Sequence, residues 1–165
     1  MSESKAIAEL KNRIEALERH VRVLDDINAI KFLQYSYGYF MDKGLYDEVV
    51  DLFADHGVLS FMGGLYKGKE SIRRLYCGRL RTTFTKGRNH PIDGVLVDHL
   101  QLQGVIDVAD DGRSALGRFR AFLQGGMHKS MQDPPAHLPR QWWEAGVYEN
   151  EYVGDGKGYK NQLTT

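Results

Sequence analysis

The chain has 165 residues, enough to bury the core of one domain and too few for two domains of ordinary size. Apolar residues make up 42% and charged residues 27%, and 22 Lys and Arg balance 22 Asp and Glu, so neither a nucleic-acid partner nor an anionic membrane surface is indicated. The longest apolar runs fall far short of the roughly 20 residues of a membrane span, and the N-terminus has no apolar signal core. We therefore expect a cytoplasmic protein.

The first 24 residues have the spacing of a coiled-coil helix. Apolar side chains recur in alternating steps of three and four, with Lys, Arg and Glu between them. Such a narrow apolar seam requires a partner, which is either the chain's own domain or a second copy. We treat residues 1–25 as an extension and residues 26–165 as the domain. The seam consists of Ile7, Leu10, Ile14, Leu17, Val21 and Leu24.

A second helix is predicted from Asp25 and Asp26 to Gly44, where a glycine provides a natural C-terminal stop. One face carries apolar residues and is interrupted by Gln34, whereas the other face carries an aromatic stripe of Phe32, Tyr35 and Tyr39. Two apolar faces predict a helix that is covered on both sides. The first face consists of Ile27, Ile30, Leu33, Tyr37 and Met41.

The remaining elements alternate in type. We expect a short helix over 45–54, a strand or hairpin over 58–68, a helix over 68–80 and a loop over 81–94. Three long strands follow at 95–108, 113–124 and 141–153, with a tight turn at 109–112. Residues 125–140 form a long loop with three of the four prolines. Helices followed by a long-stranded meander predict an α+β fold, in which a curved antiparallel sheet wraps over helices and leaves a pocket.

Periodicity alone does not single out a catalytic site. On a helical wheel Tyr37 lies with the core residues, and Asp42 points about 140° away from it, as a solvated acid would. Alternation along 95–108 puts Asp98 on the apolar face of the strand and His99 on the polar face. A lone strand histidine is most often structural, and the histidines show no metal-site spacing.

Other polar and aromatic residues leave alternatives open. Arg118 and Arg120 could bind a carboxylate or phenolate, although an outward ladder of arginines is commoner on a sheet. Aromatic residues of the last long strand, which include Trp142 and Tyr148, could line a pocket or pack in the sheet or at a subunit interface. The single cysteine, Cys77, is most simply a half-buried helical thiol.

Three segments carry a family resemblance that spans roughly residues 26–160: YGYFMDKGLYDEVVDLFADHGVLSFMGGLYKGKESI, DHLQLQGVIDVADDGRSALGRFRA and EAGVYENEYVGDGKGYK. In this order and spacing the chain resembles the SnoaL-like branch of the NTF2-like superfamily. The resemblance implies a cone-shaped α+β fold with a deep pocket and assembly as a dimer or trimer. The branch includes dehydratases, a dehydrochlorinase, polyketide cyclases and lyases of lignin-derived compounds.

The resemblance also assigns roles residue by residue. The family aspartate that orients a histidine falls on Asp42, and the proton-abstracting histidine falls on His99, while a tyrosine of the bile-acid dehydratase falls on Tyr37. This implies a lyase, dehydratase or isomerase that needs no metal or organic cofactor and acts on an apolar, aromatic or polycyclic small molecule. The alternative is a non-catalytic binding or oligomerisation domain. Expected substrate contacts are Tyr35, Arg118, Trp142 and Tyr148.

Two departures from the family pattern have consequences. A second acidic residue of the bile-acid enzyme has no counterpart in the segment ALGRFRA. Relatives also end in a strand of the pattern W-K-I-x-x-L, whereas this chain reads Gly158 to Thr165. We therefore expect the final strand to be short or partly missing, which could leave an open sheet edge.

Overall fold

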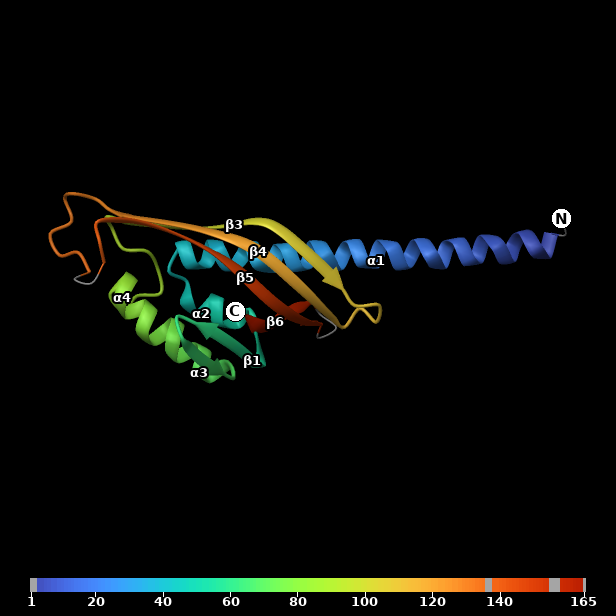
Figure 1. The fold of residues 1–165 in the computed structure, drawn as a ribbon, viewed down its shortest axis with the longest axis horizontal. Coiled ribbons are helices and arrows are strands. Elements are labelled where there is room, and N and C mark those ends of the chain that lie inside the picture. Colours follow the sequence, from blue (N-terminus) through green and yellow to red (C-terminus); the bar gives the residue numbers. More distant parts are fainter. Residues whose placement is uncertain (1–2, 136–137, 155–157, 165) are drawn as a thin grey trace.

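The computed structural model describes residues 3–135, 138–154 and 158–164 (Figure 1). Residues 1–2 of the predicted extension and residue 165 of the predicted last strand lie outside the described residues. The fold is α+β, as expected: helices come first and a long-stranded curved sheet follows. Among the described residues, no helix is both long and apolar enough to cross a membrane.

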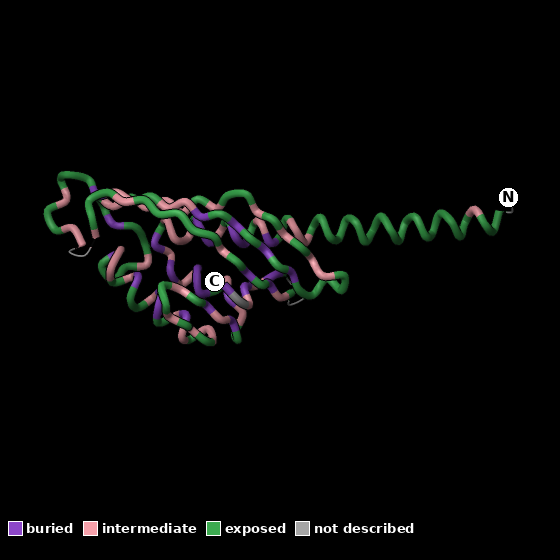
Figure 2. The backbone as a smooth tube through the Cα atoms, viewed as in Figure 1, coloured by how far each residue is buried: buried purple, intermediate pink, exposed green. Residues whose placement is uncertain are grey.

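The two N-terminal helices predicted from the sequence are one helix, α1 (Glu3–Asp42). No glycine or proline interrupts the chain before Gly38, and Asp25 and Asp26 do not end the helix. Its first half projects from the domain and is exposed along nearly its whole length, whereas its second half lies on the sheet (Figures 1 and 2). The helix ends at a turn in which Gly44 takes a positive φ of 62°.

Helix α2 (Tyr46–Asp51) follows, and then comes a continuous helical segment, which we call helical segment 69–85. It consists of α3 (Lys69–Arg73), the π-helical η1 (Arg74–Leu80) and α4 (Arg81–Thr85). The prediction of a loop from residue 81 is therefore wrong for its first turn. The hydroxyl groups of Thr82, Thr83 and Thr85 donate to carbonyl groups one turn earlier, and this local bonding accompanies the added turn.

Six strands form one sheet in the order β2-β1-β6-β5-β4-β3. All neighbours are antiparallel except β1 and β6, so the sheet is mixed rather than wholly antiparallel. Two of the three long strands were predicted almost to the residue, whereas the middle one runs three residues past its predicted end, to Met127. The strand bounds are β1 (Phe53–Phe61), β2 (Gly64–Lys67), β3 (Val95–Val108), β4 (Ser114–Met127), β5 (Gln141–Gly154) and β6 (Tyr159–Thr164).

The last strand, β6, is short, as predicted, but it does not leave an open edge. It pairs antiparallel with β5 and parallel with β1, and so lies in the middle of the sheet. The buried side chains of Tyr159 and Asn161 fix it there. The edges of the sheet are instead β2 and β3.

The interruption of the apolar face of α1 by Gln34 has a structural explanation. Gln34 is fully buried, and its Nε2 donates to Oε1 of Gln101 on β3 at 2.8 Å. Its own Oε1 accepts from Nδ2 of Asn150 at 2.8 Å and from the hydroxyl of Tyr152 at 2.9 Å, both on β5. The amide therefore joins α1 to two strands, with its hydrogen bonds largely satisfied in the core.

The prediction that α1 is covered on both sides is wrong for this chain. The sheet passes along one side of the helix, and Phe32 and Tyr39 on the other side are 76% and 69% exposed. The aromatic stripe therefore does not belong to the core of the domain.

Candidate active site

Asp42 at the end of α1 and His99 on β3 are in direct contact. Oδ1 of Asp42 accepts a hydrogen bond from the backbone N–H of His99 at 2.6 Å and lies 3.0 Å from Nδ1 of the imidazole. The two side chains are 18% and 9% exposed. In the neutral ring this contact puts the proton on Nδ1 and leaves Nε2 as the acceptor.

Residues spaced four apart on α1 make this contact possible. Gln34, Gly38 and Asp42 form one stripe that faces β3. At Gly38 the helix backbone passes so close to the strand that a Cβ would lie 2.6 Å from the carbonyl oxygen of His99. Tyr37 and Asp42 point in different directions on the helical wheel because Tyr37 faces the cavity and Asp42 faces β3. Asp42 is therefore not the solvated acid that the wheel indicated.

The polar face of β3 is the inner one. Val97 and His99 line the cavity, whereas Leu96 and Leu100 are exposed on the outer face of the sheet. Asp98 lies on that outer face and accepts a hydrogen bond from Gln124 at 2.8 Å. The β-bulge of this strand lies between residues 102 and 105, beyond His99, and so does not change the side on which His99 lies.

A cavity of about 130 Å³ opens beside His99. Helix α1, strand β1, helical segment 69–85 and the three long strands all contribute to its walls. Its lining is mainly apolar, which is usual for sites that bind small organic molecules. The main apolar contributions come from Met41, Phe61, Leu80, Phe84, Val97 and Trp142.

Tyr37, Tyr76 and Tyr148 bring a cluster of phenol groups to this cavity, which Tyr46 also lines. The hydroxyl oxygens of Tyr37 and Tyr76 are 3.1 Å apart, and the ring of Tyr148 meets that of Tyr37 edge-on with 5.6 Å between centroids. Burial raises the pKa of all three phenols well above the ordinary value, and the neighbouring phenols raise those of Tyr37 and Tyr148 further. At neutral pH the groups are therefore protonated and can donate hydrogen bonds.

The structure brings together most of the side chains predicted for the site, although their roles stay predictions. The same cavity is lined by Tyr37, His99, Trp142 and Tyr148. Asp42 does not line it but contacts His99, which does.

Tyr35 and Arg118 do not line this cavity. Tyr35 is on the exposed side of α1. The buried residues of β4 in this region are Gly117 and Phe119, so Arg118 between them points outward, where its Nε donates to Glu149 at 2.8 Å. Their expected role as substrate contacts therefore has no support in the geometry of this cavity.

Three polar residues of the cavity were not identified from the sequence, namely Tyr46, Tyr76 and Glu144. Ile72, Tyr76 and Leu80 recur every fourth residue and form the buried face of helical segment 69–85, a signal that could have identified Tyr76. Glu144 lies opposite Leu123 on the long β4–β5 ladder, and no sequence pattern distinguishes it.

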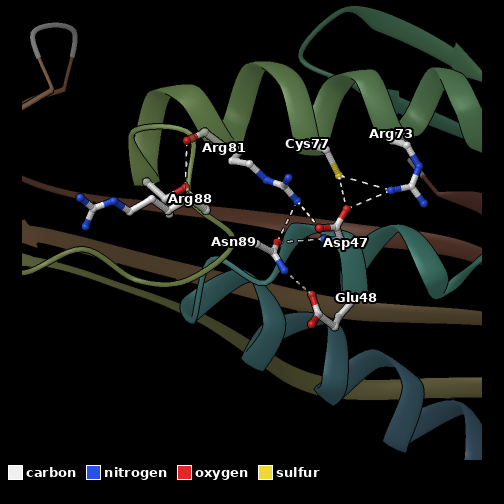
Figure 3. Close-up of polar contacts among 8 residues, drawn as sticks. Asp47, Glu48, Arg73, Cys77, Arg81, Arg88 and Asn89 are labelled. Carbon is white, nitrogen blue, oxygen red and sulfur yellow. Dashed lines mark hydrogen bonds and ion pairs between the residues drawn. The ribbon is translucent and has the colours of Figure 1, made fainter.

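Asp47 of α2 holds helical segment 69–85 in place (Figure 3). Its two carboxylate oxygens accept hydrogen bonds from Arg73 at 3.0 Å and Arg81 at 2.7 Å, and its backbone N–H donates to Asn89 at 3.2 Å. Because the same segment carries Tyr76 into the cavity, these contacts position one wall of the site.

Cys77 lies within this cluster, and its thiol donates to Oδ1 of Asp47 at 3.3 Å (Figure 3). Burial and the hydrogen bond to Asp47 raise the pKa of the thiol and outweigh the nearby arginines. The thiol is therefore protonated at neutral pH, which agrees with a packing role. Within the described residues, no group of three or more His, Cys, Asp or Glu side chains is placed to hold a metal ion.

The fold and the enclosed His–Asp pair define an α+β protein of the NTF2-like class. The chain belongs to the SnoaL-like domain family, whose model matches residues 22–163. A search of curated proteins found no match.

Solved structures share this fold. LinA has a TM-score of 0.67 at 18% identity, with 88% of this chain and 87% of that chain covered. An NTF2-like protein with a cystatin-like fold from Novosphingobium aromaticivorans has a TM-score of 0.64 at 19% identity, with 90% and 84% covered. A candidate scytalone dehydratase from the same organism has a TM-score of 0.63 at 18% identity, with 88% of each chain covered. Identities this low establish a common fold only.

Proposed function

We propose that this protein is a cofactor-independent lyase, either a dehydratase or another elimination enzyme, or an isomerase, in which His99 removes a proton from a small apolar substrate. The observation that carries the proposal is the 3.0 Å contact between Asp42 and Nδ1 of His99 beside an apolar cavity.

In the proposed reaction Nε2 of His99 accepts the proton. Within the described part of the chain Nε2 has no hydrogen-bond partner, and His99 lines the cavity, so a substrate can reach it. Asp42 keeps the ring in the required tautomer and offsets the positive charge that develops on it. A positioned base of this kind contributes on the order of 10² to 10⁴ in rate.

Tyr37 is the proposed hydrogen-bond donor to the oxygen or halogen that accumulates negative charge. Its raised pKa keeps the phenol protonated, and its hydroxyl lies 3.1 Å from that of Tyr76. Tyr76 can therefore donate to Tyr37 while Tyr37 donates to the substrate, which strengthens the second hydrogen bond.

The size and lining of the cavity favour a substrate with an aromatic or similarly compact apolar ring. The cavity volume of about 130 Å³ is close to that of cavities of roughly 150 Å³ that hold one benzene molecule. A larger or polycyclic substrate would place one ring inside and extend past Met62, which is exposed beside the cavity.

The proposal is tested with His99→Ala and Asp42→Asn, and with His56→Ala as a control because His56 is exposed on β1. A panel of aromatic and polycyclic alcohols, halides and ketones is assayed for elimination and for exchange of the substrate proton with deuterated solvent. We expect wild type and His56→Ala to react alike and the two site variants to lose about 10² or more in kcat. Unchanged turnover by both site variants would reject His99 as the catalytic base. Tight binding without turnover or exchange by wild type would favour the non-catalytic alternative.

A further inference from the structure

Among the residues that the structure describes, none buries the apolar seam of the N-terminal half of α1. Its six side chains are between 47% and 62% exposed, and the helix that carries them projects away from the domain (Figures 1 and 2). These residues are Ile7, Leu10, Ile14, Leu17, Val21 and Leu24.

The domain approaches this helix from the side opposite the seam. A groove between α1 and the β3–β4 turn, residues 108–112, is lined on the helix by seven residues, none of which belongs to the seam: Ala16, Arg19, His20, Arg22, Val23, Asp25 and Asp26. On a helical wheel these seven residues centre about 180° from the seam. The first alternative left open by the sequence, in which the seam packs on its own domain, therefore does not describe this arrangement.

We propose that residues 3–25 form a parallel two-stranded coiled coil with a second copy of this chain. The seam follows a strict heptad over three repeats, with β-branched Ile7, Ile14 and Val21 at the a positions. The d positions are all leucine, namely Leu10, Leu17 and Leu24. β-Branched a residues with leucine at d favour two parallel strands over three or four.

Charges beside the seam match a parallel pair. In a parallel coiled coil a g residue faces the e residue five positions later on the partner helix. This rule pairs Arg13 with Glu18 and His20 with Asp25. Within one helix Arg13 and Glu18 lie about 140° apart and do not face each other. Residues 3–25 also hold five Asp and Glu and five Lys and Arg, so the two copies do not repel each other.

The seam ends where the domain begins. The next a and d positions are Asn28 and Lys31, both polar, and Ile30 is already fully buried in the domain. A parallel pair therefore splays after Leu24 and places its two domains side by side at the same end. In proteins most of the stability of a helix comes from packing of its apolar face, and a partner on the seam would supply that packing here.

The first test measures the mass of the full-length protein by light scattering. Wild type is expected at twice 18.8 kDa. Leu10→Lys with Leu17→Lys places charge in the seam and is expected to halve that mass. Ala8→Lys with Asn12→Lys adds the same charge on the opposite side of the helix and should leave it unchanged. The proposal is overturned if wild type has the mass of one chain or of three. It is also overturned if the seam variant keeps the wild-type mass, which would place the contact elsewhere.

The second test establishes orientation. In a Cys77→Ser background, Leu10→Cys should form a disulfide-linked dimer under mild oxidation, because d residues face each other in a parallel pair. Asn12→Cys, on the outer side, should not. If the two helices were antiparallel and crossed at the centre of the seam, the two copies of position 10 would lie roughly 16 Å apart, and the disulfide could not form. Failure of Leu10→Cys to cross-link would therefore reject the parallel arrangement.

A charge-reversal cycle tests the predicted partners. Arg13→Glu and Glu18→Arg should each raise the dimer dissociation constant several-fold, because each places like charges across the interface. The double variant should restore it. A double variant that dimerises no more tightly than the single variants would contradict the proposed pairing of g and e residues.

Discussion

Gly38 of α1 and His99 of β3 meet where the helix crosses the edge strand of the sheet. A Cβ at Gly38 would lie 2.6 Å from the carbonyl oxygen of His99, which is closer than real Cβ contacts come. One helical turn later, Asp42 reaches both the backbone N–H and Nδ1 of the same histidine. The missing side chain of Gly38 is therefore what allows the carboxylate and the imidazole to touch.

Gly38→Ala should separate the helix from the strand and weaken the contact between Asp42 and His99. We expect a loss of about 1–3 kcal/mol in the free energy of unfolding, as for other overpacked sites, and a lower kcat. Chemical denaturation and the elimination assay measure the two effects. Gly78→Ala is the matched control, since Gly78 also lies in a helix and its Cβ would meet no atom within 4 Å. Equal stability of both variants would contradict a close crossing at Gly38.

Tyr37→Phe tests the proposed hydrogen-bond donor without removing the ring that packs in the cavity. We expect kcat to fall by about 10² or more with little change in KM, because the hydroxyl would act mainly on charge that develops during the reaction. Tyr76→Phe should lower kcat less, since its hydroxyl acts through that of Tyr37. A Tyr37→Phe enzyme with wild-type kcat would remove this residue from the mechanism.

Gly125→Ala should disturb the wall of the cavity near Trp142. A Cβ at Gly125 would overlap the indole ring of Trp142, which lies over this glycine. The ring must move, so the intrinsic fluorescence should shift and the affinity for aromatic ligands should change. Gly126→Ala is the control, because a Cβ there meets no atom within 4 Å. Identical spectra for Gly125→Ala and wild type would contradict the packing of Trp142.

Removal of the Gln34 side chain should destabilise the domain more than removal of an exposed glutamine side chain. Gln34→Ala removes one hydrogen-bond partner from each of Asn150, Tyr152 and Gln101, of which the first two are buried, and we expect a loss of about 2–4 kcal/mol. The control is Gln124→Ala on the outer face of the sheet, for which we expect about 0.5 kcal/mol or less. Unfolding in urea measures both changes.

Stability should fall at alkaline pH because buried phenols resist ionisation. Burial raises the pKa of Tyr46 to about 12 in the folded state, against about 10 in the unfolded state. Below pH 10 both states are protonated and stability is fully present. Above pH 10 the unfolded state loses the proton first, so stability falls until about pH 12, by up to about 1.4 kcal/mol per pH unit for one tyrosine.

Tyr46→Phe checks this pH dependence. The variant should lose stability less steeply between pH 10 and pH 12 than wild type, because one ionising phenol is gone. The measurement is the free energy of unfolding in urea at a series of pH values. Equal slopes for the two proteins would show that Tyr46 is not shielded in the folded state.

Local patterns in the sequence determined most of the elements and the family. Strands 95–108 and 141–153 were predicted nearly to the residue, because alternation and the turn at 109–112 are local signals. The heptad seam and the positions of Asp42 and His99 in family-like segments are also local features. Among the predictions that failed are the break between two N-terminal helices, the start of β1 at Phe53 rather than at residue 58, and the loop from residue 81. The segment from residue 81 lacks a strong periodicity, and its helical turn depends on threonine hydroxyls and on Asp47 from another helix.

Only the tertiary structure decided which side of each element faces inward. Periodicity places Leu96 and His99 on opposite faces of β3 but does not tell which face lies against the helix. In the structure the polar face is the inner one, because Gln101 and His99 form hydrogen bonds with residues of α1. The central place of β6 and the pairing of Tyr37 with Tyr76 likewise depend on residues far apart in the chain. A sequence pattern describes one element at a time, whereas burial and hydrogen bonding are satisfied jointly by several elements once they pack.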